Sequence, residues 1–122
     1  MTPLRTAEFD KGRLWHFRAQ PLRAIDGDTC VVLLDTGCYG RYEARVRIAS
    51  LWAAERNEAG GAEATARLQA ALGSGAGAWP LRVISRQRET VVSEVRSFER
   101  LVADVYVARD DGALVDIREV VA

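Results

Sequence analysis

The sequence has little of several residue types, and each shortage excludes a class of protein. Its 122 residues include two cysteines and one histidine. Cys30 and Cys38 form no Cys-x-x-Cys pattern and have no neighbouring histidine, which excludes the usual zinc-binding motifs. No apolar run approaches the roughly 20 residues that a transmembrane helix needs. We therefore expect two free thiols, and His16 is expected to be an ordinary strand residue.

Lysine is nearly absent, although charge is not. Lys11 is the only lysine, and the other sixteen of the seventeen basic residues are arginines. Seventeen acidic residues balance them, so the net charge of zero does not favour non-specific nucleic-acid binding. The arginine fork suits phosphate oxygens, but a GC-rich genome also explains a high arginine content. Arginines therefore indicate function only through their positions.

The N-terminal segment also lacks the apolar stretch of a signal peptide, because charges occur at Arg5, Glu8 and Asp10. We expect a cytoplasmic protein in which residues 1–12 are extended. A chain of 122 residues is long enough for one domain with its own core, and 1–122 is treated as a single domain.

Alternating and apolar segments predict five short strands. The clearest has Tyr42, Ala44, Val46 and Ile48 on one face and charged residues on the other. Strands are expected at 13–19 with an extension over 22–25 beyond Pro21, at 30–34, at 42–51, at 79–85, and as a long hairpin or bent pair over 91–98 and 100–107.

A different period marks the helices. Ala64, Leu68, Ala71 and Leu72 recur at helical spacing within residues 62–72, and Gly73 follows as a C-terminal stop. A short final helix is expected over 114–121. The order of elements predicts an α+β, mainly β fold. The expected architecture is a five-stranded OB-fold barrel with a helix between strands 3 and 4 and a short C-terminal helix, although the pattern alone also allows other α+β folds.

Three segments, in order, resemble the staphylococcal-nuclease (thermonuclease-like) family. Residues 24–29 (AIDGDT) resemble its "IDGDT" segment, and 47–55 (RIASLWAAE) resemble "RLxGIDAPE". Residues 97–103 (SFERLVA) resemble the later segment that contains an aromatic residue and Gly-Arg. The resemblance covers residues 22–122. It implies a calcium-dependent phosphodiesterase that cleaves DNA and RNA, of a kind often found in phage and prophage-bearing genomes.

The resemblance also implies roles for individual residues. Asp28 matches a metal-binding carboxylate, and Arg47 and Arg100 match the arginines that hold the scissile phosphate. Glu55 matches the carboxylate that positions the attacking water, and Phe98 matches an aromatic that contacts the nucleotide. Two guanidiniums and a divalent cation would stabilise the charge that builds on a phosphodiester under attack.

One position departs from the family at the metal site. Trp52 stands where the family has its second metal-binding aspartate, and an indole offers no oxygen ligand. Asp28 is then the only matched carboxylate ligand, so Ca²⁺ affinity should fall. Trp52 is either a core aromatic or a platform on which a base stacks, worth about 1–3 kcal/mol per base.

Each of the other candidates has a structural alternative. Asp28 could be a turn carboxylate, Arg47 one charge on a solvated strand face, and Glu55 a residue that favours a helix dipole. Glu99, beside Arg100, replaces a glycine of the family and could pair with that arginine or reshape its turn.

The expected function is phosphodiester hydrolysis with metal assistance, weakened or lost because of Trp52. The alternative is a non-catalytic OB-fold module that binds nucleic acid or a protein partner through the same cleft, and a structural component of an assembly is a third class. The family usually continues into a third helix, whereas this chain ends at Ala122. A second copy or a protein partner is expected to cover that end.

Overall fold

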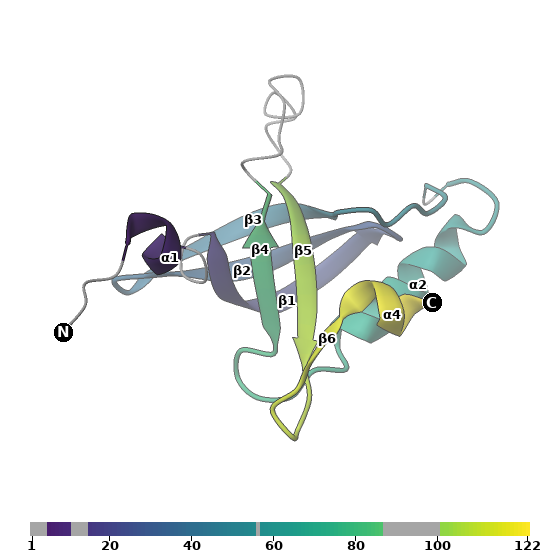
Figure 1. Ribbon diagram of the computed structural model, residues 1–122. Helices are drawn as coiled ribbons and strands as arrows, with labels where there is room; N and C mark the ends of the chain where they lie inside the picture. Colours follow the sequence, from purple (N-terminus) through teal and green to yellow (C-terminus); the bar gives the residue numbers. More distant parts are fainter. Residues whose placement is uncertain (1–4, 11–14, 56, 87–100) are drawn as a thin grey trace.

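The computed structural model describes residues 5–10, 15–55, 57–86 and 101–122, and it shows a curved β-sheet with helices beside it (Figure 1). The elements in chain order are α1 (Thr6–Asp10), β1 (His16–Asp26), β2 (Thr29–Gly37), β3 (Gly40–Ile48), α2 (Gly61–Leu72), β4 (Leu81–Ser85), β5 (Leu101–Ala108), β6 (Leu114–Asp116) and α4 (Ile117–Val121).

The sheet closes into a five-stranded barrel. Its strand order is β3-β2-β1-β4-β5-β6, and a further pairing joins β3 to β5. That pairing is parallel, with Val46 opposite Leu101, whereas all other pairings are antiparallel. With α2 between β3 and β4 and a short helix at the end, this arrangement is OB-fold-like and confirms the predicted fold. Within the described ranges, no helix is long and apolar enough to cross a membrane.

The core forms where the alternating faces of the strands meet α2. Ala44, Val46 and Ile48 of β3 are buried, as their spacing predicts. Ala64, Leu68, Ala71 and Leu72 of α2 are buried against the strands, and the backbone N–H of Gly73 donates to the Gln69 carbonyl at the helix end. Burial of each large aliphatic side chain stabilises the fold by roughly 1.5–3 kcal/mol.

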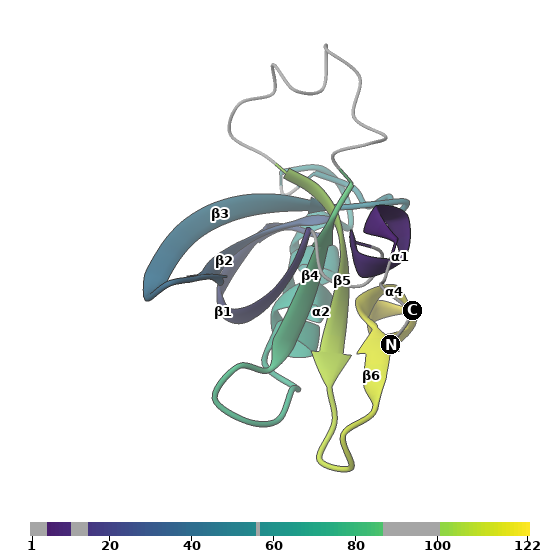
Figure 2. The ribbon, with the colours of Figure 1, turned by 60° about the vertical axis from the view of Figure 1, so that its left-hand side comes forward.

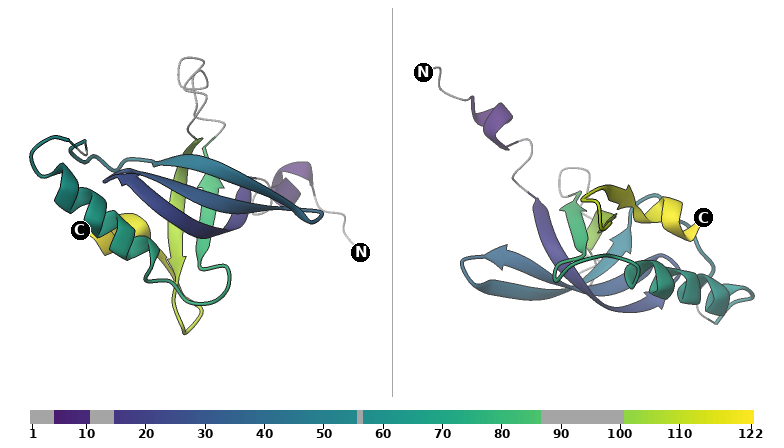
Figure 3. Two further views of the ribbon diagram at one scale, coloured as in Figure 1. Left: turned by 180° about the vertical axis from the view of Figure 1, so that it is seen from behind. Right: turned by 90° about the horizontal axis from the view of Figure 1, so that it is seen from below.

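Tyr42 is an exception to the predicted core face, since it is 58% exposed. The hairpin of β2 and β3 reaches away from β4, β5 and the helices (Figures 2 and 3), so no other described element covers its outer part. Cys38 and Tyr39 form its tip with positive φ angles of 54° and 64°. Alternation identifies which side chains share a face, but it does not reveal where the barrel ends.

Several boundaries also differ from the sequence expectations. The strand expected over 42–51 is β3 and ends at Ile48, and the strand expected over 79–85 is β4 and begins at Leu81. Strand β1 runs unbroken through Pro21, because the pairing register with β2 shifts between Pro21 and Arg23. The expected extended N-terminal segment contains α1, which lies on the side of the barrel away from α2 and α4 (Figure 3). The expected helix over 114–121 is divided into β6 and α4, and Asp116 caps α4 by accepting from the Arg118 backbone N–H. The expected strand over 91–98 lies outside the described residues.

Candidate functional site

The turn between β1 and β2 meets the end of β3. The Ile48 backbone N–H donates to the Asp28 carbonyl at 2.8 Å, and Thr29 pairs with Arg47 across the two strands. This register places Asp28 Oδ2 3.8 Å from Arg47 Nη2, while Thr29 Oγ1 donates to Asp28 Oδ1 at 3.0 Å. The structure therefore brings together the first two residues that the family resemblance singles out.

Arg47 lies between a carboxylate and an aromatic ring. Its guanidinium is 4.7 Å from the centre of the Trp52 ring, a cation–π contact. Its separation of 3.8 Å from Asp28 is too long for a hydrogen bond. Within the part of the chain that the structure describes, Arg47 donates no side-chain hydrogen bond, so its N–H groups are available to an anion. Asp28, Arg47 and Trp52 are called the Arg47 cluster below.

Trp52 is 80% exposed, so its interpretation as a core aromatic is wrong. The segment that carries it is fixed at Ala49, whose N–H donates to the Ala103 carbonyl at 2.8 Å and whose carbonyl accepts from Arg118 Nη1 at 3.2 Å. Ser50 then takes a positive φ of 57°. The backbone just before Trp52 is therefore anchored by hydrogen bonds, while the Trp52 indole lies in solvent.

Gly27 places the cluster against α2 and the segment after β3. A Cβ atom at this position would lie 2.6 Å from Ala53 Cβ and 2.7 Å from Ala64 Cβ. Neither neighbour is a flexible side chain, and Gly27 does not have a positive φ. The glycine is therefore needed for close approach, which keeps the Asp28 turn next to the residue that follows Trp52.

Of the remaining predicted site residues, the structure describes Glu55, which is not joined to this cluster. Glu55 is exposed, and its carboxylate makes no hydrogen bond or ion pair with the residues that are described. Helix α2 begins only at Gly61, so Glu55 is not in its first turn and does not act on its dipole. Phe98 and Arg100 lie outside the described residues.

The residues at the cluster do not fit a calcium ion. Ca²⁺ takes six to eight oxygen ligands, usually with several carboxylates among them. Asp28 supplies one carboxylate, and its oxygens face Arg47 and Thr29. The indole of Trp52 supplies no oxygen ligand. Across the described ranges, no group of three or more His, Cys, Asp and Glu side chains is placed to hold a metal ion.

A second charged network supports the segment that leads to Trp52, and the sequence patterns gave no sign of it. Arg118 Nη2 is 2.6 Å from Asp116 and 3.7 Å from Asp104, and Arg86 contacts both oxygens of Asp104 at 3.0 and 2.8 Å. The Arg118 side-chain hydrogen bond lowers the pKa of Asp116. Because Arg118 also contacts the Ala49 carbonyl, it links α4 to the end of β3.

Comparison with known proteins adds no family assignment, since no protein-family model matches the sequence and no characterised protein matches it.

Proposed function

We propose that this chain is a divergent domain of the staphylococcal-nuclease type that binds single-stranded nucleic acid at the Arg47 cluster. The observation that carries the proposal is the position of Arg47, with a carboxylate on one side, an exposed indole on another, and N–H groups that make no hydrogen bond to the described residues. The resemblance of residues 24–29 and 47–55 to that family points to the same residues.

The chemistry of the cluster matches two parts of a nucleotide. A guanidinium forms charge-assisted hydrogen bonds to phosphate oxygens, often in pairs. The Asp28–Arg47 ion pair is long and partly solvated, and such pairs contribute about 0–1 kcal/mol, so a phosphate can compete for Arg47. Trp52 adds an exposed aromatic surface for stacking of a base, which is independent of base sequence.

Metal-assisted phosphodiester hydrolysis is the second candidate. The contact between Asp28 and Arg47 favours it, because the resemblance assigns metal binding to the first and phosphate binding to the second. Trp52 removes the other metal-binding carboxylate of the family. We therefore expect nucleic-acid binding without calcium-dependent cleavage, and we expect Trp52→Asp to restore a second carboxylate ligand.

Binding is tested by fluorescence anisotropy of labelled single-stranded DNA and RNA. Arg47→Gln should weaken binding about tenfold or more, since hydrogen bonds to charged groups are worth roughly 1.5–3 kcal/mol. Arg109→Gln is the matched control, because it removes the same charge in the turn after β5, where Arg109 contacts Ser74. Equal losses for the two variants would show bulk electrostatics and refute the site.

Cleavage is tested separately with the same oligonucleotides in Ca²⁺, Mg²⁺ and Mn²⁺. Wild type should leave them intact in Ca²⁺, and Trp52→Asp should gain cleavage. If wild type cleaves in any of the three metals, and Glu55→Gln and Arg47→Ala both still cleave, the assignment of these residues is contradicted.

A further inference from the structure

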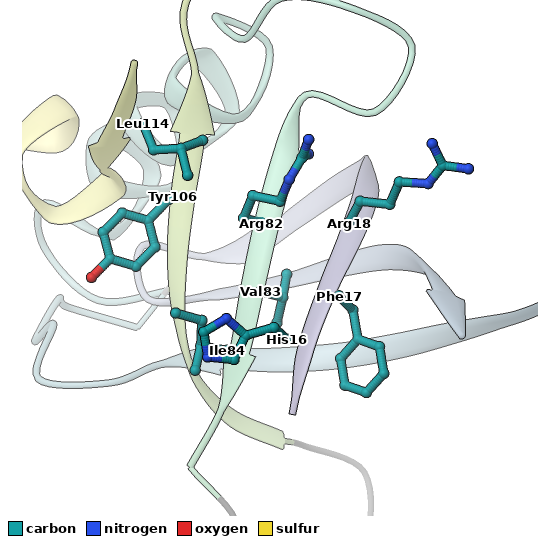
Figure 4. A pocket seen from close by; sticks show the side chains of 8 residues that line it. All are labelled: His16, Phe17, Arg18, Arg82, Val83, Ile84, Tyr106 and Leu114. Carbon is teal, nitrogen blue, oxygen red and sulfur yellow. The ribbon is translucent and has the colours of Figure 1, made fainter. Parts of the chain in front are cut away.

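A pocket of about 450 Å³ opens on the face formed by β1, β4 and β5, and Leu114 of β6 also lines it (Figure 4). Ile84, Tyr106 and Leu114 contribute apolar surface, and Leu114 is 51% exposed. Three side chains with basic groups also line it, His16, Arg18 and Arg82. None of these residues belongs to the Arg47 cluster, and neither the fold nor the proposed function accounts for them.

Arg82 is held in place without a carboxylate partner. Its Nη1 donates to the Trp79 carbonyl at 2.7 Å and to the Leu81 carbonyl at 3.0 Å. Neutral carbonyls fix the guanidinium but do not cancel its charge, and no carboxylate of the described residues forms an ion pair with it. Arg18 differs, since its Nε lies 2.6 Å from Asp35 Oδ2 and its guanidinium stacks over Trp79.

Two acidic side chains are in register with pocket residues, and both are paired with arginines. Asp116 stands opposite Tyr106 in the β5–β6 register and lies 2.6 Å from Arg118. Asp104 stands opposite Ile84 in the β4–β5 register, and Arg86 contacts both of its carboxylate oxygens. The charge facing the pocket is therefore positive and comes mainly from Arg82. Figure 4 shows Arg82 between Tyr106 and Leu114 on one side and Arg18 on the other.

From this arrangement we infer that the pocket binds a small organic anion with an aromatic or aliphatic body. A volume of about 450 Å³ lies in the range of small-molecule sites, which are mostly apolar with a few fixed polar groups. The body of the ligand packs against Ile84, Tyr106 and Leu114. Its carboxylate or phosphate accepts hydrogen bonds from the Arg82 N–H groups that the backbone carbonyls leave open. This inference does not depend on the proposed nucleic-acid site.

The test uses 2-naphthoate and its uncharged analogue 2-naphthalenemethanol as probes, with calorimetry for affinity and amide NMR shifts for location. Wild type should bind the anion about tenfold tighter or more, with shifts in β4 and β5. Arg82→Gln should remove that preference. Arg67→Gln, an equal charge change on an exposed position of α2, should keep it.

Leu114→Glu provides a variant that tests the site even if Arg82→Gln unfolds, since Leu114 is half exposed and lies at the pocket. Both probes should lose the Leu114 contact, but the added carboxylate repels only the anion, so Leu114→Glu should weaken naphthoate binding more than naphthalenemethanol binding and remove the preference of wild type for the anion. Equal affinity of wild type for both probes, no binding of naphthoate, or shifts confined to the Arg47 cluster would overturn the inference.

Discussion

Replacement of Gly27 by alanine tests the packing that holds the candidate site together. The new Cβ would be 2.6 Å from Ala53 Cβ and 2.7 Å from Ala64 Cβ. Carbon atoms pack best at about 3.5–4.0 Å, so both contacts are about 1 Å too short. Relief requires movement of α2 or of the segment after β3, because a Cβ atom has no side-chain torsion that could move it away.

Two effects of opposite sign set the magnitude. Replacement of glycine by alanine usually stabilises a protein by about 0.4–1 kcal/mol, because the unfolded chain loses freedom. Overpacking of a well-packed site costs about 1–3 kcal/mol. Overpacking should win here, and Gly27→Ala should lower the free energy of unfolding by roughly 1–2 kcal/mol.

Urea denaturation measures this effect, and Gly73→Ala is the matched control. A Cβ at Gly73 would meet only backbone oxygens at 3.6 and 3.7 Å, and the residue has a helical φ of −82°. Gly73→Ala should therefore be neutral or stabilising. In an Ala53→Gly background one of the two short contacts disappears, so Gly27→Ala should cost less there, with a coupling of roughly 0.5–3 kcal/mol.

The reasoning also predicts a functional loss, since movement of Ala53 displaces its neighbour Trp52. Gly27→Ala should weaken oligonucleotide binding more than Gly73→Ala. A Gly27→Ala protein as stable as wild type, with no coupling to Ala53, would show that the turn and α2 are not in close contact and would refute the account.

Three further results are expected. Trp52→Ala should weaken single-stranded DNA binding by about 1–3 kcal/mol in an anisotropy titration, and an unchanged affinity would remove base stacking from the proposal. Ellman's reagent should modify only Cys38 in the folded protein, because Cys30 is buried and burial raises its pKa to about 12; two fast-reacting thiols would contradict this. The folded-state pKa of Asp116 lies below its unfolded value of about 3.9, so its stabilising contribution is present above about pH 4 and is lost as the pH falls through the folded pKa. Urea titrations should therefore show a shallower acid loss of stability for Asp116→Asn, and an identical pH profile would contradict the pairing with Arg118.

The barrel could be predicted because its core depends on short-range patterns. The period of two at Ala44, Val46 and Ile48 and the helical spacing around Leu68 are properties of the local chain. The exposure of Tyr42 and the pairing of β6 with β5 depend on where distant segments end. Arg118 acts on Ala49 from the other end of the chain, and no local pattern indicates such a contact.

The candidate site was predictable in part. The motif segments identified Asp28 and Arg47, and the β2–β3 register brings them together. Gly27 lies in the turn between β1 and β2, where a glycine usually supplies conformational freedom. The structure gives a different reason for the glycine, since its φ is not positive and the two alanines leave no room for a side chain. Such packing depends on α2 and cannot be inferred from the turn itself.

Trp52 shows why exposure matters more than residue type at this site. Tryptophan is usually largely buried, which agrees with the core position that was one of the two interpretations of Trp52. The structure instead leaves 80% of it in solvent and places its ring against Arg47. An exposed cation–π contact is worth about 0.5–1 kcal/mol, so folding gains little from this indole. In the proposed function its larger contribution comes only when a base stacks on it, and Trp52→Ala should therefore lower binding while leaving stability nearly unchanged.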